Sequence, residues 1–174
     1  QQALPNVTIE PDVTTGLPGL IGLIQDGIAD MQRKAQFLIS VAPYLMAPSS
    51  SARRAIMWRW ILTKADETGV SRRSFPVLAA LSCLVCSQVL NPAKLLLKPS
   101  HRFDEKQAYS ALCDLRALEL FVYTLALFPE LPATLCTKDR PLALFWAGLG
   151  IHNISLDQQK HPTFELRCDR LLPN

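Results

Sequence analysis

The sequence is poor in glycine and in charged residues. Seven of its 174 residues are glycine and 19% are charged, whereas 49% are hydrophobic. This composition is too apolar and too weakly charged for a disordered segment. Leucine-rich and alanine-rich runs with little glycine favour helices over a β-sandwich. The length is typical of one domain and allows a core that needs no disulfides.

No secretory or membrane-spanning segment is visible in the sequence. The start at Gln1 lacks a positive charge leading into an apolar run, so no signal peptide is visible, and we expect a fragment or a processed product. The longest apolar stretch, 115–128, is interrupted by Arg116, Glu119 and Thr124. It is too short for a bilayer, which needs about 20 apolar residues. We expect no membrane partner.

The five cysteines do not form a disulfide framework that can be recognised. Their number is odd, and most of them lie in apolar helical sequence. This favours a reducing compartment, so we expect an intracellular protein, either cytoplasmic or nuclear. Cys83 and Cys86 have the spacing of a metal pair, but structural zinc pairs usually lie in turns. We therefore expect these two cysteines to be core residues.

The signatures of common enzymes are missing. The sequence contains no phosphate-binding loop, no dinucleotide fingerprint, no HExxH and no GxSxG motif. Three histidines are present, but their spacing does not select a Cys–His nucleophilic pair. We therefore expect a protein that is not an enzyme and that has no cofactor and no metal.

The remaining pattern predicts an all-α fold, a single compact multi-helix domain with about five main helices and some short ones. Closely spaced prolines and β-branched residues predict an extended N-terminal arm at 1–17. The helical core is expected over 18–150, and an extended tail over 151–174 is expected to pack on it. Residues 163–168 alternate like a strand, but no partner strand can be identified.

Capping residues, prolines and apolar spacing locate the helices. The main ones are expected at 18–43, 52–67, 75–90, 104–128 and 139–150, with a short basic helix at 93–98. The helix at 75–90 is apolar nearly all round, and so is the segment 120–128. Because such helices belong inside a fold, we expect both to be buried on all sides.

The first predicted helix carries a single apolar stripe whose members are three and four residues apart. The stripe consists of Leu20, Leu23, Ile24, Ile28, Met31, Ala35, Leu38 and Ile39. Glycines at 19, 22 and 27 weaken the first half of this helix by about 1 kcal/mol each. Either these glycines permit close approach of another helix, or the helix is frayed there.

Charge is distributed unevenly along the chain. Residues 33–102 contain eleven basic and two acidic residues, a net charge of +9, whereas the rest of the chain has seven basic and thirteen acidic residues, a net charge of −6. An electropositive region of this kind suits an anionic partner. Alternatively, the acidic flanks fold back onto the basic middle and neutralise it.

Eight basic residues in this region are candidate contacts to nucleic acid or another anion. Arginine suits phosphate because its guanidinium can form two parallel hydrogen bonds. The candidates are Arg53, Arg54, Arg59, Arg72, Arg73, Lys94, Lys98 and Arg102. If the domain binds RNA or DNA, we expect them to converge on one surface and binding to weaken steeply with salt.

Trp58 and Trp60 are candidate partner-binding residues on the second predicted helix. Positions two apart on a helix lie about 200° apart around its axis, so these side chains do not share a face. Either this helix is buried on two sides, or one tryptophan lies at the surface beside Arg53, Arg54 and Arg59.

These observations predict a non-enzymatic helical interaction module that binds a partner protein or self-associates, through grooves between helices and the N-terminal arm. Such a module should have an exposed apolar patch or groove. The alternative is a nucleic-acid-binding helical domain that uses the basic 33–102 region, such as a nucleocapsid or chromatin accessory. A third hypothesis, a small-molecule or lipid pocket, predicts a closed apolar cavity of a few hundred Å³.

Overall fold

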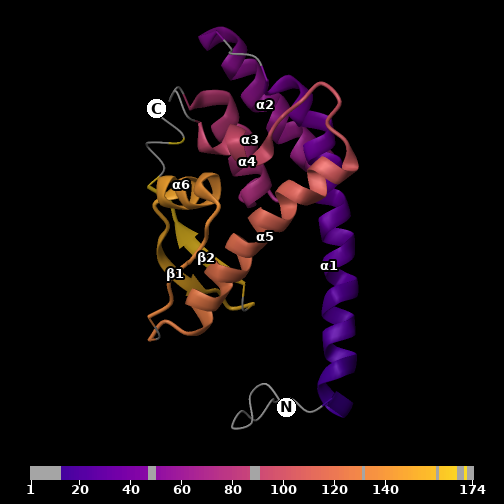
Figure 1. The fold of residues 1–174 in the computed structure, drawn as a ribbon, viewed down its shortest axis with the longest axis vertical. Helices are drawn as coiled ribbons and strands as arrows, with labels where there is room; N and C mark the ends of the chain where they lie inside the picture. Colours follow the sequence, from indigo (N-terminus) through magenta and orange to yellow (C-terminus); the bar gives the residue numbers. More distant parts are fainter. Residues whose placement is uncertain are drawn as a thin grey trace.

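The computed structural model describes residues 13–46, 50–86, 91–130, 132–159, 161–167 and 171, with side chains from residue 27 onward. These residues form six α-helices, a 3-10 turn and a two-stranded sheet, which confirms the predicted all-α fold class (Figure 1). The elements are α1 (Val13–Val41), η1 (Ala42–Tyr44), α2 (Ser51–Glu67), α3 (Phe75–Val85), α4 (Pro92–Leu97), α5 (Glu105–Leu127), α6 (Arg140–Leu149), β1 (His152–Leu156) and β2 (Pro162–Glu165).

Capping side chains determine where four of these helices begin. Ser50, Asn91, Asp104 and Asp139 each accept a hydrogen bond from a backbone N–H in the first turn of the helix that follows. Such bonds satisfy donors that the helix itself leaves without a partner. The predicted starts at 52, 104 and 139 therefore agree with the structure to within one residue.

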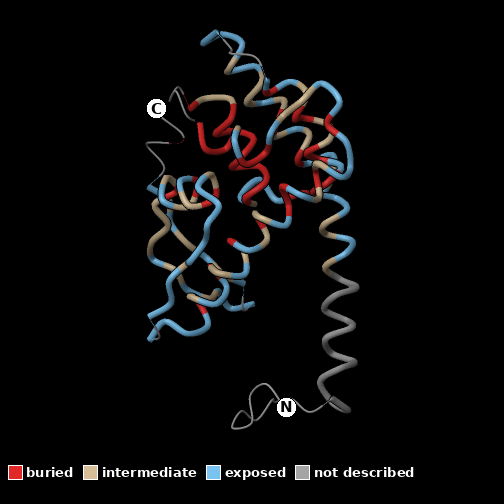
Figure 2. Tube along the Cα trace, viewed as in Figure 1, coloured by how far each residue is buried: buried red, intermediate tan, exposed pale blue. Residues whose placement is uncertain are grey.

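The core is centred on α3, and Figure 2 shows the buried residues gathered around it. Nine of the eleven residues of α3 are buried, because α1, α2, α4 and α5 all contact this helix. The prediction of a central, fully buried helix is therefore confirmed. The helix is shorter than expected, since it ends at Val85, and residues 87–90 lie outside the described part of the chain.

The second half of α1 packs across α5 (Figure 1). The described buried residues of α1 begin at Lys34, whose Nζ lies 2.7 Å from Oε1 of Glu119 in α5 and 2.7 Å from Oδ2 of Asp30. Phe37 and Leu38 follow it into the core and are fully buried. This junction fixes the crossing point of α1 and α5.

The predicted N-terminal arm needs one correction. Helix α1 begins at Val13 rather than at residue 18, so residues 13–17 are helical and not extended. β-branched residues lower helix propensity only slightly, and a long helix can include them. The rest of the predicted arm, residues 1–12, lies outside the described part of the chain.

The tail predicted to be extended contains an antiparallel hairpin. Strand β1 pairs with β2, and Ser155 lies opposite Thr163. The Asp157 carboxylate accepts hydrogen bonds from the backbone N–H groups of Gln159 and His161, which closes the turn. The alternating segment at 163–168 was recognised in the sequence, but its partner was missed because β1 has only five residues, with burial on alternate positions.

Candidate functional site

The second half of α5 has a row of exposed apolar side chains, although the sequence predicts burial on all sides. Leu120 is 52% exposed, and Tyr123, Leu127 and Phe128 are exposed as well. Because Leu120, Tyr123 and Leu127 are three and four positions apart, they lie on one face of the helix. This segment was predicted wrongly, since an apolar sequence does not show how many sides of a helix have neighbours.

The opposite face of α5 is covered by α6 and the hairpin. Ala126 is buried there, and the Phe121 ring meets the Trp146 ring of α6 edge-on, with centroids 5.1 Å apart. Strands β1 and β2 also contact α5. The helix is therefore held by α6 and the hairpin, and the face of Leu120 and Tyr123 is left partly open to solvent.

Leu120 and Tyr123 form one wall of an open cleft of about 560 Å³, which we call the α5 cleft. The other walls come from the start of α3 and from β2, with Phe75, Pro162 and Phe164. The rings of Phe75 and Phe164 stack with centroids 5.9 Å apart and an interplanar angle of 8°. This stacking joins the hairpin to the helical core and gives the cleft an aromatic floor.

Basic side chains line the rim of the α5 cleft. The Arg73 guanidinium is exposed and makes no ion pair with any described residue, whereas Nδ1 of the exposed His161 lies 3.8 Å from Oδ2 of Asp157. Glu119 also lines the cleft, but Lys34 holds its carboxylate at 2.7 Å and Arg116 holds it at 2.9 Å. The cleft therefore combines apolar walls with positive charge at its edge.

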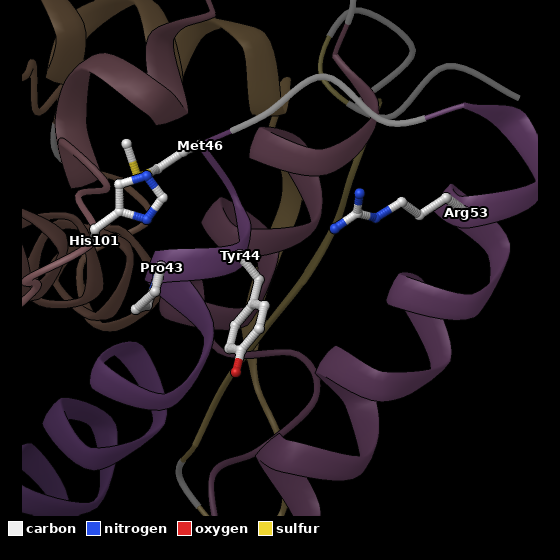
Figure 3. A pocket seen from close by; sticks show the side chains of 5 residues that line it. All are labelled: Pro43, Tyr44, Met46, Arg53 and His101. Carbon is white, nitrogen blue, oxygen red and sulfur yellow. The ribbon is translucent and has the colours of Figure 1, made fainter.

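A second pocket brings together some of the predicted anion contacts, and we call it the Arg53 pocket. It has a volume of about 620 Å³ and lies between η1, the start of α2 and the loop before α5 (Figure 3). Arg53 extends from α2 toward Tyr44, and His101 lies beside Met46 (Figure 3). Nζ of Lys94 is 3.4 Å from the backbone oxygen of Met46, so a second candidate cation reaches its edge.

The candidates Arg72 and Arg73 lie far from this pocket. They follow the C-terminal end of α2, whose 17 residues span roughly 25 Å at 1.5 Å per residue. Two hydrogen bonds, of 2.6 and 2.9 Å, join the Arg72 guanidinium to the Asp66 carboxylate. They hold the pKa of Asp66 below its ordinary value, and they neutralise Arg72.

The remaining candidates have separate environments. Arg59 and Arg102 are exposed, and Arg54 is half-buried with its Nε covered and without a hydrogen-bond partner among the described residues. Lys98 ends α4 in a left-handed conformation. Burial and the charge of Asp139 raise the pKa of Asp114, and the positive charge of Lys98 partly opposes this rise. The eight residues are thus divided between at least two parts of the molecule.

Ion pairs neutralise part of the basic 33–102 region. Four of its eleven cations are paired, namely Arg33, Lys34, Lys64 and Arg72. Arg33 pairs with Asp30, and Lys34 pairs with Glu119. Both carboxylates come from outside the region, as the neutralisation hypothesis requires. The other seven make no ion pair with a described residue, so the region keeps a positive surface that is not continuous.

Trp58 and Trp60 are both half-buried, and both pack against the hydrophobic core. The Trp60 ring also meets Tyr44 edge-on, with centroids 5.0 Å apart. The large apolar residue that α2 presents to solvent is instead Ile56, which is 69% exposed. Sequence reasoning missed Ile56, although its position three residues from both Arg53 and Arg59 placed it on the polar face.

The described residues offer little that supports metal or nucleophile chemistry. Cys83 lies in α3, where burial raises the pKa of its thiol. No group of three or more His, Cys, Asp and Glu side chains in the described part of the chain is placed to hold a metal ion. Among the described helices, none has both the length and the apolar character that crossing a membrane requires.

Comparison of the chain with protein-family models, with curated proteins and with solved structures finds no match. An all-α architecture is compatible with many activities, because fold alone does not determine function. The chemistry of the α5 cleft and of the Arg53 pocket is therefore the basis for a functional assignment.

Proposed function

We propose that this chain is a protein-interaction module that binds an apolar protein segment in the α5 cleft. The observation that carries the proposal is the exposed face of Leu120, Tyr123 and Leu127 beside an open cleft of about 560 Å³. An apolar groove between helices is a common binding site for an amphipathic segment, which inserts side chains at positions three and four apart.

The chemistry of the cleft supports a protein ligand with apolar anchors and acidic residues. Phe75, Tyr123 and Phe164 supply aromatic surface, and burial of such surface dominates the energy of many interfaces. The unpaired positive charge of Arg73 at the rim favours a segment with negative charge, because complementary charges orient a ligand and speed its association.

The test is a selection of displayed peptides on the wild-type protein, followed by measured affinities for variants. We expect apolar peptides with acidic residues, and a loss of affinity of tenfold or more for Leu120→Asp and Tyr123→Asp. Ile56→Asp is the matched control, because Ile56 is exposed and apolar but lies outside the cleft. Peptides that bind Leu120→Asp as well as wild type, or a selection that yields none, would contradict the proposal.

Binding of nucleic acid at the Arg53 pocket is a second candidate function. Its support is that Arg53, His101 and the exposed Tyr44 line one pocket, with Lys94 at its edge. Anisotropy of a labelled single-stranded RNA and a DNA duplex, titrated at about 50 and 200 mM salt, tests it. We expect binding that Arg53→Glu abolishes and Arg72→Glu preserves, since Asp66 already occupies Arg72. Equal loss in both variants, or no binding, would reject this candidate.

A further inference from the structure

Cations gather at the Arg53 pocket, and none of the residues that line it is acidic. Arg53 and His101 are part of its lining, and Nζ of Lys94 reaches its edge by donating to the backbone oxygen of Met46. Arg102 follows His101 in the same turn and is exposed. Arg53, Lys94 and Arg102 make no ion pair with any described residue, so their charge remains available to an anionic ligand.

The acidic residues near the pocket in the sequence do not line it. Asp104 and Glu105 follow the turn of the pocket along the chain, and the Asp104 carboxylate caps α5 by accepting a backbone N–H in its first turn. Asp66 and Glu67 lie thirteen and fourteen positions after Arg53, which is roughly 20 Å along α2 at 1.5 Å per residue. The positive charge of the pocket is therefore set apart from the carboxylates of α2.

The ring of Tyr44 is presented inside this ring of cations. It is 54% exposed and lies between Arg53 on one side and His101 and Met46 on the other (Figure 3). The Trp60 ring meets it at an interplanar angle of 69°, with centroids 5.0 Å apart. This contact orients the Tyr44 ring without burying it, so a flat ligand can stack on it with little further loss of conformational freedom.

We infer that the Arg53 pocket holds one unstacked base of a single-stranded nucleic acid, with Tyr44 against the base and Arg53 against a phosphate. This inference rests on the second candidate function and adds the form of nucleic acid that binds and the group that meets each part of it. The volume of about 620 Å³ lies within the range of small-molecule sites. A base inside a duplex has both faces covered by its neighbours, whereas the base of a single strand is free to enter a pocket and stack on an aromatic ring.

The cations come from three elements, which suits a strand that passes across the pocket. Arg53 belongs to α2, Lys94 to α4 and Arg102 to the turn before α5. The guanidinium of Arg53 can form two parallel hydrogen bonds to a phosphate, and its place in the first turn of α2 adds the positive end of the helix dipole. Lys94 and Arg102 are then available to the phosphates on either side of the bound base.

Photocrosslinking tests the contact with the base directly. The full chain is mixed with oligo-uridine or oligo-thymidine of about eight nucleotides that carries one 5-iodouracil, and it is irradiated and digested for mass spectrometry. We expect the crosslink at Tyr44 with both oligomers, since neither stacking nor a phosphate contact depends on the sugar. Tyr123 is the control, because it is 39% exposed and does not line this pocket. A bound oligomer that gives its crosslink at Tyr123, or gives none at Tyr44, would overturn the inference.

Affinities of variants test the stacking. Tyr44→Leu keeps an apolar side chain of similar size and should weaken binding of the single strand about tenfold, whereas Tyr44→Phe keeps the ring and should bind as wild type does. Tyr123→Leu should change little. The wild-type protein should bind a duplex at least tenfold more weakly than the single strand. Equal affinity of Tyr44→Leu and Tyr44→Phe would overturn the inference.

Salt dependence tests the phosphate contacts. Three contacts to a single strand give a slope of about −2 in a plot of log affinity against log salt, or a loss of about 20-fold between 50 and 200 mM. Arg53→Gln removes one contact and should make the slope shallower by about 0.7. Arg59→Gln is the control, because Arg59 is an exposed cation of α2 that does not line the pocket. A slope that Arg53→Gln leaves unchanged would overturn the contact between Arg53 and a phosphate.

The inference and the candidate function fail in different ways. A duplex that binds as tightly as the single strand, with binding lost in Arg53→Glu and unchanged in Tyr44→Leu, overturns the inference alone and keeps the pocket as a nucleic-acid site. A chain that binds neither form at about 50 mM salt overturns both.

Discussion

α3 and the second half of α5 are both strongly apolar helical segments, and they have opposite surroundings. α3 is contacted by four other helices, and nine of its residues are buried. The second half of α5 is covered by α6 and the hairpin on one side, and its other face exposes Leu120, Tyr123 and Leu127. The apolar character of a helix shows that it needs neighbours, whereas the rest of the chain decides whether they are present. An apolar face that lacks them is a candidate interface.

The largest expected difference between the two helices is in thiol reactivity. Cys83 of α3 is buried and burial raises its pKa, so it is neutral and inaccessible until the core opens, whereas Cys113 of α5 is exposed. Alkylation followed by mass spectrometry should label Cys113 on the order of 10³-fold faster than Cys83. Comparable rates would show that α3 opens locally and that the contrast between the helices is wrong.

The next largest effect is on the free energy of unfolding. Leu81→Ala in α3 removes a buried side chain and should cost about 3 kcal/mol, through lost burial and the cavity left behind. Leu120→Ala in α5 is the matched control and should change stability by only about 0.5 kcal/mol. Urea denaturation at low protein concentration measures both. Similar costs would mean that Leu120 is covered in solution.

A smaller effect is expected where α5 passes from its covered half to its exposed half. Lys34→Ala leaves the Glu119 carboxylate without its closest partner in a place where both side chains are largely buried, so we expect a loss of about 2 kcal/mol. Lys64→Ala is the control, because its ion pair with Glu67 is more exposed and should contribute about 0.5 kcal/mol or less. Equal losses in the same urea measurement would argue against a junction between α1 and α5.

The smallest effect concerns the Arg72–Asp66 pair beside α3. Since Arg72 lowers the pKa of Asp66, the pair stabilises the fold above the ordinary pKa of a carboxyl group, and this contribution is lost as pH falls through the lower folded-state pKa. In Arg72→Ala, the pKa of Asp66 should rise toward its ordinary value, as measured by NMR titration of its carboxyl carbon. Arg73→Ala should leave it unchanged, and an equal rise there would assign the shift to the wrong arginine.

Local signals in the sequence predicted much of the fold. Asp104 and Asp139 begin their helices through side-chain hydrogen bonds within three residues, so their positions could be read from the sequence. The burial of α3 was predicted because it is apolar all round. Strand β1 was missed, since five alternating residues give a weak signal and strand pairing depends on a partner elsewhere in the chain.

The site could be predicted only in part. The sequence indicated an exposed apolar groove but not its location, because the α5 cleft is formed by residues near positions 75, 120 and 163, which meet only after folding. The eight basic candidates were identified as a group along the chain, and the structure divides them because α2 separates Arg53 from Arg72 and Arg73. Contacts such as these depend on tertiary structure and leave no local pattern.

The ion pair between Lys34 and Glu119 has a consequence for synthesis of the chain. Its two residues are 85 positions apart. At a translation rate of about 5–20 residues per second, Lys34 waits roughly 4–17 s before Glu119 is made. Throughout that interval α5 is incomplete, whereas α2 and α3, which also contact α1, are made earlier in it. We therefore expect the apolar face of α1 to be only partly covered until α5 is complete, and apolar surface that is exposed during folding favours aggregation.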